Sequence, residues 1–366
     1  MKIAVFEPYI EGLGGAQKVI AKYCSYLQSM NHSVEIFTQK HNPKTAYPDF
    51  KQIKINLIKP SNKNLSALTF SKKFKGFDIY ITNDFPSNFI SLKNKPTVWV
   101  CYSPKRYFYD LKNYFLNNLP FLKRLVLRLK ILLFRKRDFI SAKKTSLIMP
   151  ISKTVDARIE KYYRRSDTKI FYCGIDFDNY KTGNQENYFL YISRLEKPKR
   201  IDLAIKAMNY VKNKSLKLYI VGQGPEESNL KNIAGKNVEF LGAISDVKLI
   251  ELYSNCIGVI YTPINEDWGL IPLEAGASGK PTIGANEGGL RETIINNKTG
   301  FLINDVDEKK IAEKIDYLST NLSKAKSMGL QAREKAKQFD WKNLLPEFEK
   351  KLIEIEVKHR KDYKTS

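Results

Sequence analysis

Two glutamates, Glu266 and Glu274, lie on either side of Gly269. An apolar run over 256–261 predicts a strand before them, and a helix is expected to begin near Leu270. The N terminus of such a helix offers unpaired N–H groups and positive dipole charge, which suit a diphosphate. Carboxylates at two depths can accept hydrogen bonds from two different sets of sugar hydroxyls. This segment therefore predicts a phosphate- and sugar-binding site, unless Glu274 is only a solvated helix residue.

Short apolar stretches alternate with helical patterns along the chain, which is typical of parallel α/β sheets. A first series of strands is predicted at 2–7, 33–38, 78–82, 97–101 and 146–150, with a helix at about 15–29. A second series is predicted at 187–193, 216–222, 237–242, 256–261, 281–285 and 300–303, with a helix at about 200–211 and others from about 306 to 357. Strand character is lost around 174–183, so we expect two similar α/β halves.

The composition supports two folded domains. The 366 residues are 43 % hydrophobic and 12 % aromatic, enough for two substantial cores. No apolar run reaches the roughly 20 residues that span a bilayer, and the first residues predict a strand rather than a secretion signal. The scattered Cys24, Cys101, Cys173 and Cys256 predict neither disulfides nor a zinc site, so we expect a cytoplasmic protein without a structural metal.

The net charge of +24 is concentrated in the first half of the chain. Residues 1–172 contain 32 Lys and Arg against 11 Asp and Glu, whereas the remaining residues contain 30 against 27. The first half is therefore expected to meet an anionic partner, either a membrane surface or a nucleic acid. A lysine-rich surface can also reflect genome bias alone.

Residues 119–137 form a basic amphipathic pattern. At 100° per residue, an apolar arc comprises Phe121, Leu122, Leu125, Val126, Leu129, Leu132 and Leu133. Basic side chains flank this arc, and no acidic residue occurs between Asp110 and Asp138. Such a helix can lie in the headgroup layer of an anionic membrane, or it can be a core helix with a solvated basic face. We predict the membrane contact.

The spacing of Glu266 and Glu274, with GGLRETI following at 288–294, resembles the family 4 retaining glycosyltransferases. SRLEKPKRIDLAIKA (193–207), VGQGP (221–225) and FLGAISD (240–246) occur in that family's order and spacing. The resemblance implies the GT-B fold, an α/β architecture of two facing Rossmann-like domains with parallel sheets. Its domains would be an acceptor domain over 1–172 and a donor domain over 173–340. A C-terminal segment over 341–366 would begin with a helix that crosses back to the first domain.

The resemblance also implies roles for individual donor-site residues. Arg194 and Lys199 match the basic pair that grips the donor diphosphate, Glu266 matches the glutamate that binds the sugar, and Glu274 matches the one that binds the ribose. Arg194, Lys199 and Glu266 would thus be the catalytic residues. The backbone N–H groups of Trp268, Gly269, Leu270 and Ile271 would face sugar and phosphate. Gly14 and Gly15 match the loop that lets the phosphate approach the first domain.

On the acceptor side, Tyr102, Arg106 and Tyr107 follow the strand predicted at 97–101. The segment resembles the mannosyltransferase branch of the family, except that Tyr102 replaces its histidine. Tyrosine titrates near pH 10 and cannot carry a proton as imidazole does. The substitution leaves open a form of the fold that has lost catalysis. The EDWG segment (266–269) also resembles this branch, which indicates GDP-mannose as donor.

Two acidic pairs, Asp176 with Asp178 and Asp305 with Asp307, imitate a metal-binding motif of another transferase fold. We interpret both as structural, so no metal or other cofactor is expected. The predicted activity is retaining transfer of a hexose, with mannose favoured, to a lipid-linked or polysaccharide-precursor acceptor. The enzyme would lie at the cytoplasmic face of the cell membrane. The alternative from another class is an RNA- or polyanion-binding protein, which the missing nucleic-acid module disfavours.

Overall fold

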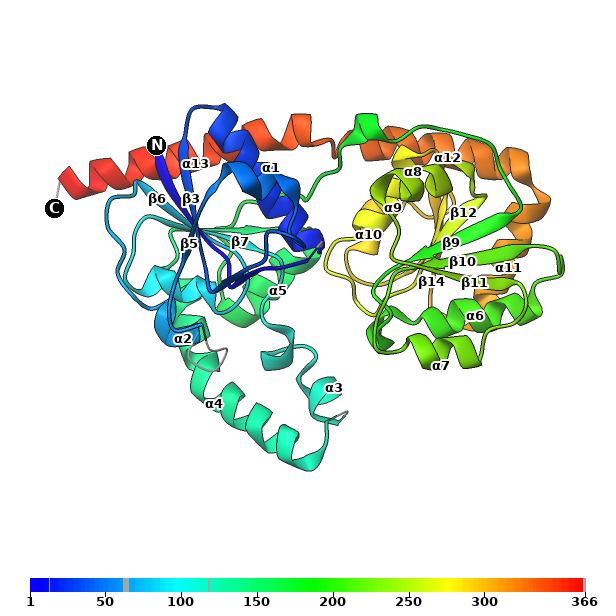
Figure 1. Ribbon diagram of the computed structural model, residues 1–366, viewed down its shortest axis with the longest axis horizontal. Helices are drawn as coiled ribbons and strands as arrows, with labels where there is room; N and C mark the ends of the chain where they lie inside the picture. The colour runs from blue at the N-terminus through cyan, green and yellow to red at the C-terminus, as the bar shows by residue number, and fades with distance from the viewer. Residues whose placement is uncertain (13, 62–65, 118, 365–366) are drawn as a thin grey trace. The chain divides into compact units, whose positions relative to one another are not determined.

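The computed structural model describes residues 1–12, 14–61, 66–117 and 119–364. The chain forms two compact units. The N-terminal unit combines Met1–Tyr172 with Leu344–Ser366, and the second unit is Cys173–Asn343. Each unit is built around one parallel sheet (Figure 1).

The sheet of the N-terminal unit has the strand order β5-β3-β1-β6-β7-β8, and all of its pairings are parallel. Its strands are β1 (Lys2–Phe6), β3 (Ser33–Thr38), β5 (Lys54–Leu57), β6 (Ile79–Thr82), β7 (Thr97–Cys101) and β8 (Leu147–Pro150). A separate parallel pair is formed by β2 (Tyr9–Ile10) and β4 (Lys40–His41). The five strands predicted for this half are confirmed, and the sequence analysis missed β5 and the short pair.

Helices and 3-10 turns connect these strands. They are α1 (Gly15–Ser29), η1 (Pro48–Gln52), α2 (Ser66–Thr69), η2 (Ser87–Leu92), η3 (Arg106–Phe108), α3 (Lys112–Asn117), α4 (Phe121–Lys144) and α5 (Lys153–Tyr163). An aromatic cluster fills one face of the sheet, where the Phe6 ring lies 5.1 Å from Phe37 and 4.9 Å from Phe74. The first half of α4 extends away from this core (Figure 1).

The C-terminal helix α13 (Trp341–Lys364) packs against the N-terminal unit and continues beyond its predicted end at 357. Phe348 stacks on Phe171 with ring centroids 4.3 Å apart. Glu349 accepts a hydrogen bond from the Tyr26 hydroxyl at 3.1 Å and lies 2.8 Å from His32 Nε2. Ring packing and these polar contacts therefore hold α13 on α1 and its neighbours.

The second unit repeats the topology with the strand order β11-β10-β9-β12-β13-β14. Its strands are β9 (Tyr188–Ile192), β10 (Lys217–Val221), β11 (Val238–Gly242), β12 (Gly258–Tyr261), β13 (Thr282–Ala285) and β14 (Gly300–Ile303), which confirms all six predicted strands. When the six strands of each sheet are numbered in chain order, their order across the sheet is 3-2-1-4-5-6. This is a Rossmann-type order, whose ligand crevice lies at the carboxyl ends of the first and fourth strands.

Helices cover both faces of the second sheet. They are η4 (Phe177–Asn179), η5 (Lys197–Lys199), α6 (Ile201–Tyr210), α7 (Glu227–Asn232), α8 (Asp246–Asn255), α9 (Leu270–Ala277), α10 (Leu290–Thr293), α11 (Glu308–Thr320) and α12 (Leu322–Lys337). Helix α6 packs beside α11, and α9 packs beside α12. Gly276 on α9 makes this second approach close, since a Cβ there would lie 2.8 Å from the Ala332 carbonyl oxygen.

The four cysteines are reduced and buried in these cores. Within the described ranges, no helix is long and apolar enough to cross a membrane. The same ranges contain no group of three or more His, Cys, Asp or Glu side chains that could hold a metal ion.

Candidate functional site

Lys199 and Glu266 meet at the Rossmann-type crevice of the second unit. Lys199 follows β9, Glu266 follows β12, and these two strands are neighbours at the point where the strand order reverses. The Lys199 Nζ atom donates to Glu266 Oε2 at 2.8 Å, with about a fifth of each side chain exposed. The fold therefore places a cation and a carboxylate together where ligands of such sheets bind.

Tyr261 contacts both members of this pair. Its hydroxyl lies 3.4 Å from Lys199 Nζ, and the Lys199 ammonium lies 5.7 Å from the centre of its ring. Burial, followed by the negative charge of Glu266, raises the pKa of the Tyr261 phenol well above its usual value. Tyr261 therefore stays a neutral hydrogen-bonding group that orients both charged side chains.

Glu274 is buried on α9 and is held by two tyrosines. The Tyr253 hydroxyl donates to Glu274 Oε2 at 2.9 Å, and the Tyr180 phenol is a second hydrogen-bonding partner. Only 9 % of Glu274 is exposed, so its interpretation as a solvated helix residue is wrong. Burial raises the pKa of both tyrosines, and the Glu274 charge raises it further. The carboxylate is thus fixed in orientation before any ligand arrives.

The helix α9 begins at Leu270, as the sequence predicts. Its N-cap residue, Gly269, has φ +108°, and a Cβ there would lie 2.8 Å from a Leu290 methyl group. Gly269 also has no side chain with which to cap the N–H groups of Leu270 and Ile271. Backbone geometry and space therefore both favour glycine, which leaves these amides able to face an anion.

The Trp268 side chain has a structural position. It is 3 % exposed, its Nε1 donates to the Cys173 carbonyl at 2.8 Å, and its ring packs on Phe339 at 5.1 Å. The indole thus anchors the loop that carries Glu266. Any contact of Trp268 with a ligand would come from its backbone, which is the part assigned to ligand contact in the sequence analysis.

Two further contacts shape the Glu266 loop, and the sequence analysis did not assign them. The Gly289 N–H donates to the Glu266 carbonyl at 2.8 Å, and a Cβ on Gly288 would lie 2.2 Å from that oxygen. Glu287 pairs with Arg200 at 2.7 Å and accepts from the Asn265 N–H at 3.0 Å. The two adjacent glycines of the GGLRETI motif could have indicated this contact, because glycine permits two backbone segments to approach closely.

Arg194 is not gathered with Lys199 and Glu266. Its side chain is 77 % exposed and forms an ion pair with Glu196 at 3.1 Å. The nearby turn is fixed by glycine, since a Cβ on Gly222 would lie 1.9 Å from the Ser193 carbonyl oxygen. Arg194 therefore stands at the rim of the site on a rigid turn, with a long side chain that can reorient toward an anionic ligand.

The two acidic pairs have structural contacts. Asp178 pairs with Lys342, and Asp307 accepts from the Lys310 N–H at 2.8 Å at the start of α11. Asp307 therefore caps the N terminus of α11, in agreement with its structural interpretation.

In the N-terminal unit, Gly14 and Gly15 open α1 after β1 and β2. Tyr102 lies beside this turn, and its hydroxyl donates to the Ala16 carbonyl at 3.3 Å. The structure thus brings Tyr102 together with the two glycines. Leu13, between the glycines Gly12 and Gly14, lies outside the described residues.

Arg106 and Tyr107 point to different environments. Arg106 pairs with Asp110 at 2.7 Å. Tyr107 instead lines a hollow of about 290 Å³ together with Lys105, whose ammonium lies 5.7 Å from the tyrosine ring. Burial raises the pKa of Tyr107, so its phenol stays protonated near neutral pH. Tyr107 and Lys105 are therefore positioned to contact a ligand, whereas Arg106 stabilises its own loop.

Glu7 is a candidate that the sequence analysis did not assign. It follows β1 at the crevice of the first sheet, is 4 % exposed, and has no partner for Oε2 among the described residues. Burial and then the charge of Asp84 raise its pKa well above the usual range. Lys105, which pairs with Asp84 at 3.2 Å, acts in the opposite direction.

The apolar arc of α4 is exposed. All seven of its members, from Phe121 to Leu133, are 50–76 % exposed. Ile131, which lies outside the arc, is buried, and Phe134 packs against the aromatic cluster. The interpretation of α4 as a core helix that buries this arc is therefore wrong.

Solved structures share this fold over nearly the whole chain. Sucrose-phosphate synthase of Thermosynechococcus elongatus superposes with a TM-score of 0.79 at 19 % identity, covering 100 % of both chains. HepE of Anabaena in complex with UDP gives a TM-score of 0.76 at 19 % identity, covering 97 % of this chain and 100 % of that one. The protein thus has the GT-B fold, in which one chain forms two Rossmann-like domains.

Two family models match the chain, one in each half. The model for group 1 glycosyl transferases matches residues 175–335, and that for glycosyltransferase family 4 matches residues 13–179. The alpha-1,3/1,6-mannosyltransferase ALG2 of Dictyostelium discoideum is 23 % identical over 92 % of this chain and 93 % of its own. Human ALG2 is 32 % identical over 41 % of this chain and 40 % of its own. The chain belongs to the family 4 glycosyltransferases, with a group 1 glycosyl transferase domain in its second unit.

Proposed function

We propose that this glycosyltransferase transfers mannose from GDP-mannose, with retention of configuration and without a metal ion. The observation that carries the proposal is the Lys199–Glu266 pair beside the open N terminus of α9. A cation and backbone amides can stabilise a diphosphate, while a carboxylate can accept hydrogen bonds from sugar hydroxyls. The mannosyltransferase relatives support mannose as the sugar.

In this proposal, catalysis comes from groups that bind the transition state more tightly than the substrate. As the bond between the sugar C1 and the phosphate oxygen breaks, negative charge grows on the diphosphate. Lys199 and the N–H groups of Leu270 and Ile271 would stabilise that charge, and Arg194 could reach it from the rim. The acceptor hydroxyl forms the new bond to C1 and gives its proton to the departing phosphate oxygen. Glu266 would hold the sugar, and Glu274 would hold the ribose.

A thermal-shift screen with GDP, UDP and ADP and their sugars tests the donor assignment. We expect GDP-mannose to raise the melting temperature most, because a ligand at about 100 times its Kd adds about 2.7 kcal/mol to the free energy of unfolding. A larger shift with a UDP- or ADP-sugar would reject GDP-mannose. The absence of a shift with every nucleotide would reject donor binding altogether.

We further propose that the acceptor is a lipid-linked or polysaccharide-precursor glycan, and that α4 binds the anionic cytoplasmic face of the cell membrane. The exposed apolar arc supports this, because contiguous apolar patches on soluble surfaces mark binding sites. Basic residues flank the arc on the same helix, including Lys123, Arg128 and Lys130. This combination suits the boundary between headgroups and acyl chains.

Replacing Leu125, Leu129 and Leu132 with serine tests the membrane contact. Burial of each leucine contributes up to about 1.5–3 kcal/mol, so co-sedimentation with anionic liposomes should fall at least about tenfold. The matched control replaces the exposed Leu57, Leu68 and Leu330 with serine, and it should bind like the parent. Unchanged liposome binding by the folded α4 variant would reject membrane docking. Salt-sensitive RNA binding that survives in that variant would favour the polyanion alternative.

A further inference from the structure

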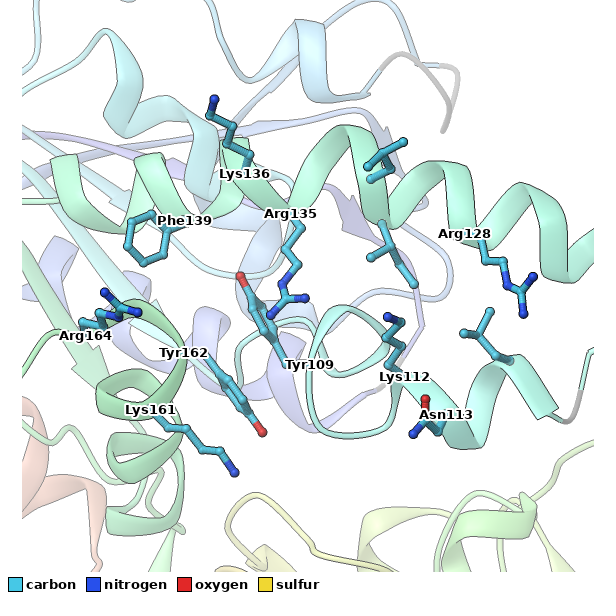
Figure 2. A pocket seen from close by; sticks show the side chains of 13 residues that line it. Tyr109, Lys112, Asn113, Arg128, Arg135, Lys136, Phe139, Lys161, Tyr162 and Arg164 are labelled. Carbon is cyan, nitrogen blue, oxygen red and sulfur yellow. The ribbon is translucent and has the colours of Figure 1, made fainter.

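A large basic pocket lies between α3, α4 and the C-terminal end of α5 (Figure 2). Its volume is about 1020 Å³, comparable with the largest common small-molecule sites, about 300–1000 Å³. The cations along its lining come from all three helices or their ends: Lys112, Arg128, Arg135, Lys136, Lys161 and Arg164. Within the described part of the chain, its lining includes no acidic residue, and none of these cations forms an ion pair.

The pocket is held in shape by Tyr109. The Tyr109 hydroxyl donates to Asp138 Oδ2 at 2.8 Å, and the same buried carboxylate accepts from Tyr163 at 2.8 Å and from Asn88 at 2.8 Å. The Arg135 guanidinium lies 5.1 Å from the centre of the Tyr109 ring. A cation held over a fixed ring loses less conformational freedom when it binds an anion.

Each of the three aromatic rings that line the pocket already has an aromatic or cationic neighbour, which argues against nucleic-acid bases as ligands. For Phe139 this neighbour is the Lys143 ammonium, 5.8 Å from the ring centre. Tyr109 and Tyr162 stack on each other, with centroids 4.7 Å apart and planes 22° apart. Arg135 approaches Tyr109, and the Lys161 ammonium lies 5.5 Å from the centre of the Tyr162 ring. Single-stranded nucleic acids bind largely by stacking bases on open aromatic faces. The pocket instead presents cationic groups, which suit phosphate oxygens.

The pocket adjoins the exposed apolar arc of α4. In Figure 2, Arg128 and Arg135 point toward the space between α3 and α4, and Lys112 approaches it from α3. At 100° per residue, Arg128 and Arg135 lie on the helix face next to the arc. Leu132 belongs to both, because it lines the pocket and is 76 % exposed. A ligand with an anionic head and an apolar chain would therefore contact both surfaces.

We propose that this pocket binds the phosphate groups at the head of a lipid, while the lipid chain lies along the apolar arc of α4. The inference rests on the membrane contact of the proposed function and adds a specific headgroup site to it. Two sources share this chemistry: the diphosphate of a lipid-linked acceptor and the phosphate of a bulk anionic phospholipid. Arg forks and Lys ammonium groups bind either one through charge-assisted hydrogen bonds.

Isothermal titration calorimetry on the full chain tests the pocket, with farnesyl diphosphate, farnesol and inorganic diphosphate as probes. The parent should bind farnesyl diphosphate at least about tenfold more tightly than either other probe, since only that probe uses both surfaces. The variant Lys112→Gln/Arg135→Gln/Lys161→Gln should lose this preference. The control Lys51→Gln/Lys75→Gln/Lys95→Gln removes the same charge from exposed positions outside both the pocket and α4, and it should keep the preference. Equal losses in both variants would overturn the pocket in favour of general charge attraction.

Further arms identify the ligand source. Tighter binding of farnesyl diphosphate than of short-chain phosphatidylglycerol supports the acceptor-type diphosphate, whereas equal affinities support a bulk phospholipid. An RNA oligonucleotide that bound more tightly than both, and lost affinity in the pocket variant, would overturn the lipid assignment. Thermal shifts with GDP-mannose separate the two proposals. A parent that bound farnesyl diphosphate but no nucleotide would refute the donor assignment and leave the pocket intact.

Discussion

The Lys199–Glu266 ion pair leads to a prediction about Glu266→Gln. Lys199 Nζ lies 2.8 Å from Glu266 Oε2, so the cation proposed to bind the diphosphate is also paired with Glu266. Glutamine keeps a carbonyl oxygen for Lys199 but removes the charge. Because both side chains are partly exposed, the free energy of unfolding should fall by no more than about 1 kcal/mol.

GDP binding and mannose transfer should then respond differently to the substitution. Lys199 would be released more easily toward a diphosphate, so the affinity for bare GDP should stay the same or rise by up to about tenfold. Transfer should fall, because a charged acceptor of sugar hydroxyl bonds is worth about 1.5–3 kcal/mol, or roughly 10- to 150-fold in kcat/KM. Calorimetry with GDP and a radiolabelled-mannose transfer assay measure the two effects.

A matched control is Glu35→Gln, which removes the charge from the 3.0 Å pair with Lys54 on the first sheet. This variant should leave both GDP affinity and transfer unchanged. Lys199→Gln is the reciprocal variant, and it should weaken GDP binding. If Glu266→Gln lost GDP affinity as severely as it lost transfer, the assignment of Glu266 to the sugar and Lys199 to the diphosphate would be refuted.

Three further predictions follow from other parts of the two units. Glu274→Ala should weaken nucleotide-sugar binding by roughly 1–3 kcal/mol in a titration. It should also lower the free energy of unfolding more than Glu266→Ala does, because the buried Tyr253 and Tyr180 hydroxyls lose their acceptor. Equal loss of bare-nucleotide binding in both variants would contradict the division of roles. Transfer should persist in EDTA, since Lys199 and the start of α9 supply the positive charge; abolition that Mg²⁺ or Mn²⁺ reverses would show a metal requirement. The pKa of Glu7 is raised by burial and by Asp84, so its stabilising contribution is present below its unfolded pKa and is lost as the pH rises through the folded one. Glu7→Gln should therefore be more stable than the parent at pH 8 by about 1 kcal/mol or more in urea denaturation, with a smaller difference at pH 4; a parent whose stability did not fall relative to the variant would exclude a buried, ionising Glu7.

Regular local patterns explain what the sequence could predict. The strand before Glu266 and the helix start at Leu270 follow from an apolar run, a glycine and a change of hydrophobic period, all of which are local. The strand β5, KINL, alternates polar and apolar residues at a sheet edge, with an exposed Lys54 and Leu57, so it lacks the continuous apolar character of the other strands. Its pairing depends on β3, which sequence pattern alone does not specify.

The directions in which side chains point could not be predicted from the sequence. Arg194 and Lys199 occur in one motif, yet only Lys199 contacts Glu266, because the turn after β9 directs Arg194 toward Glu196. The burial of Glu274 depends on Tyr180 and Tyr253, which come from distant segments. The helix α4 shows a related limit. Its periodicity predicted the apolar arc correctly, but only the fold shows that this arc faces outward.

Because all four cysteines are buried, the folded chain should react only slowly with thiol reagents. Burial raises the pKa of Cys24, Cys173 and Cys256, which leaves little reactive thiolate at neutral pH. A single cysteine introduced at the exposed Leu132 would thus accept a fluorophore without competition from native thiols. The emission of that label would report whether the proposed contact of α4 with a bilayer forms. The rate at which the native thiols are labelled would measure the rate of unfolding.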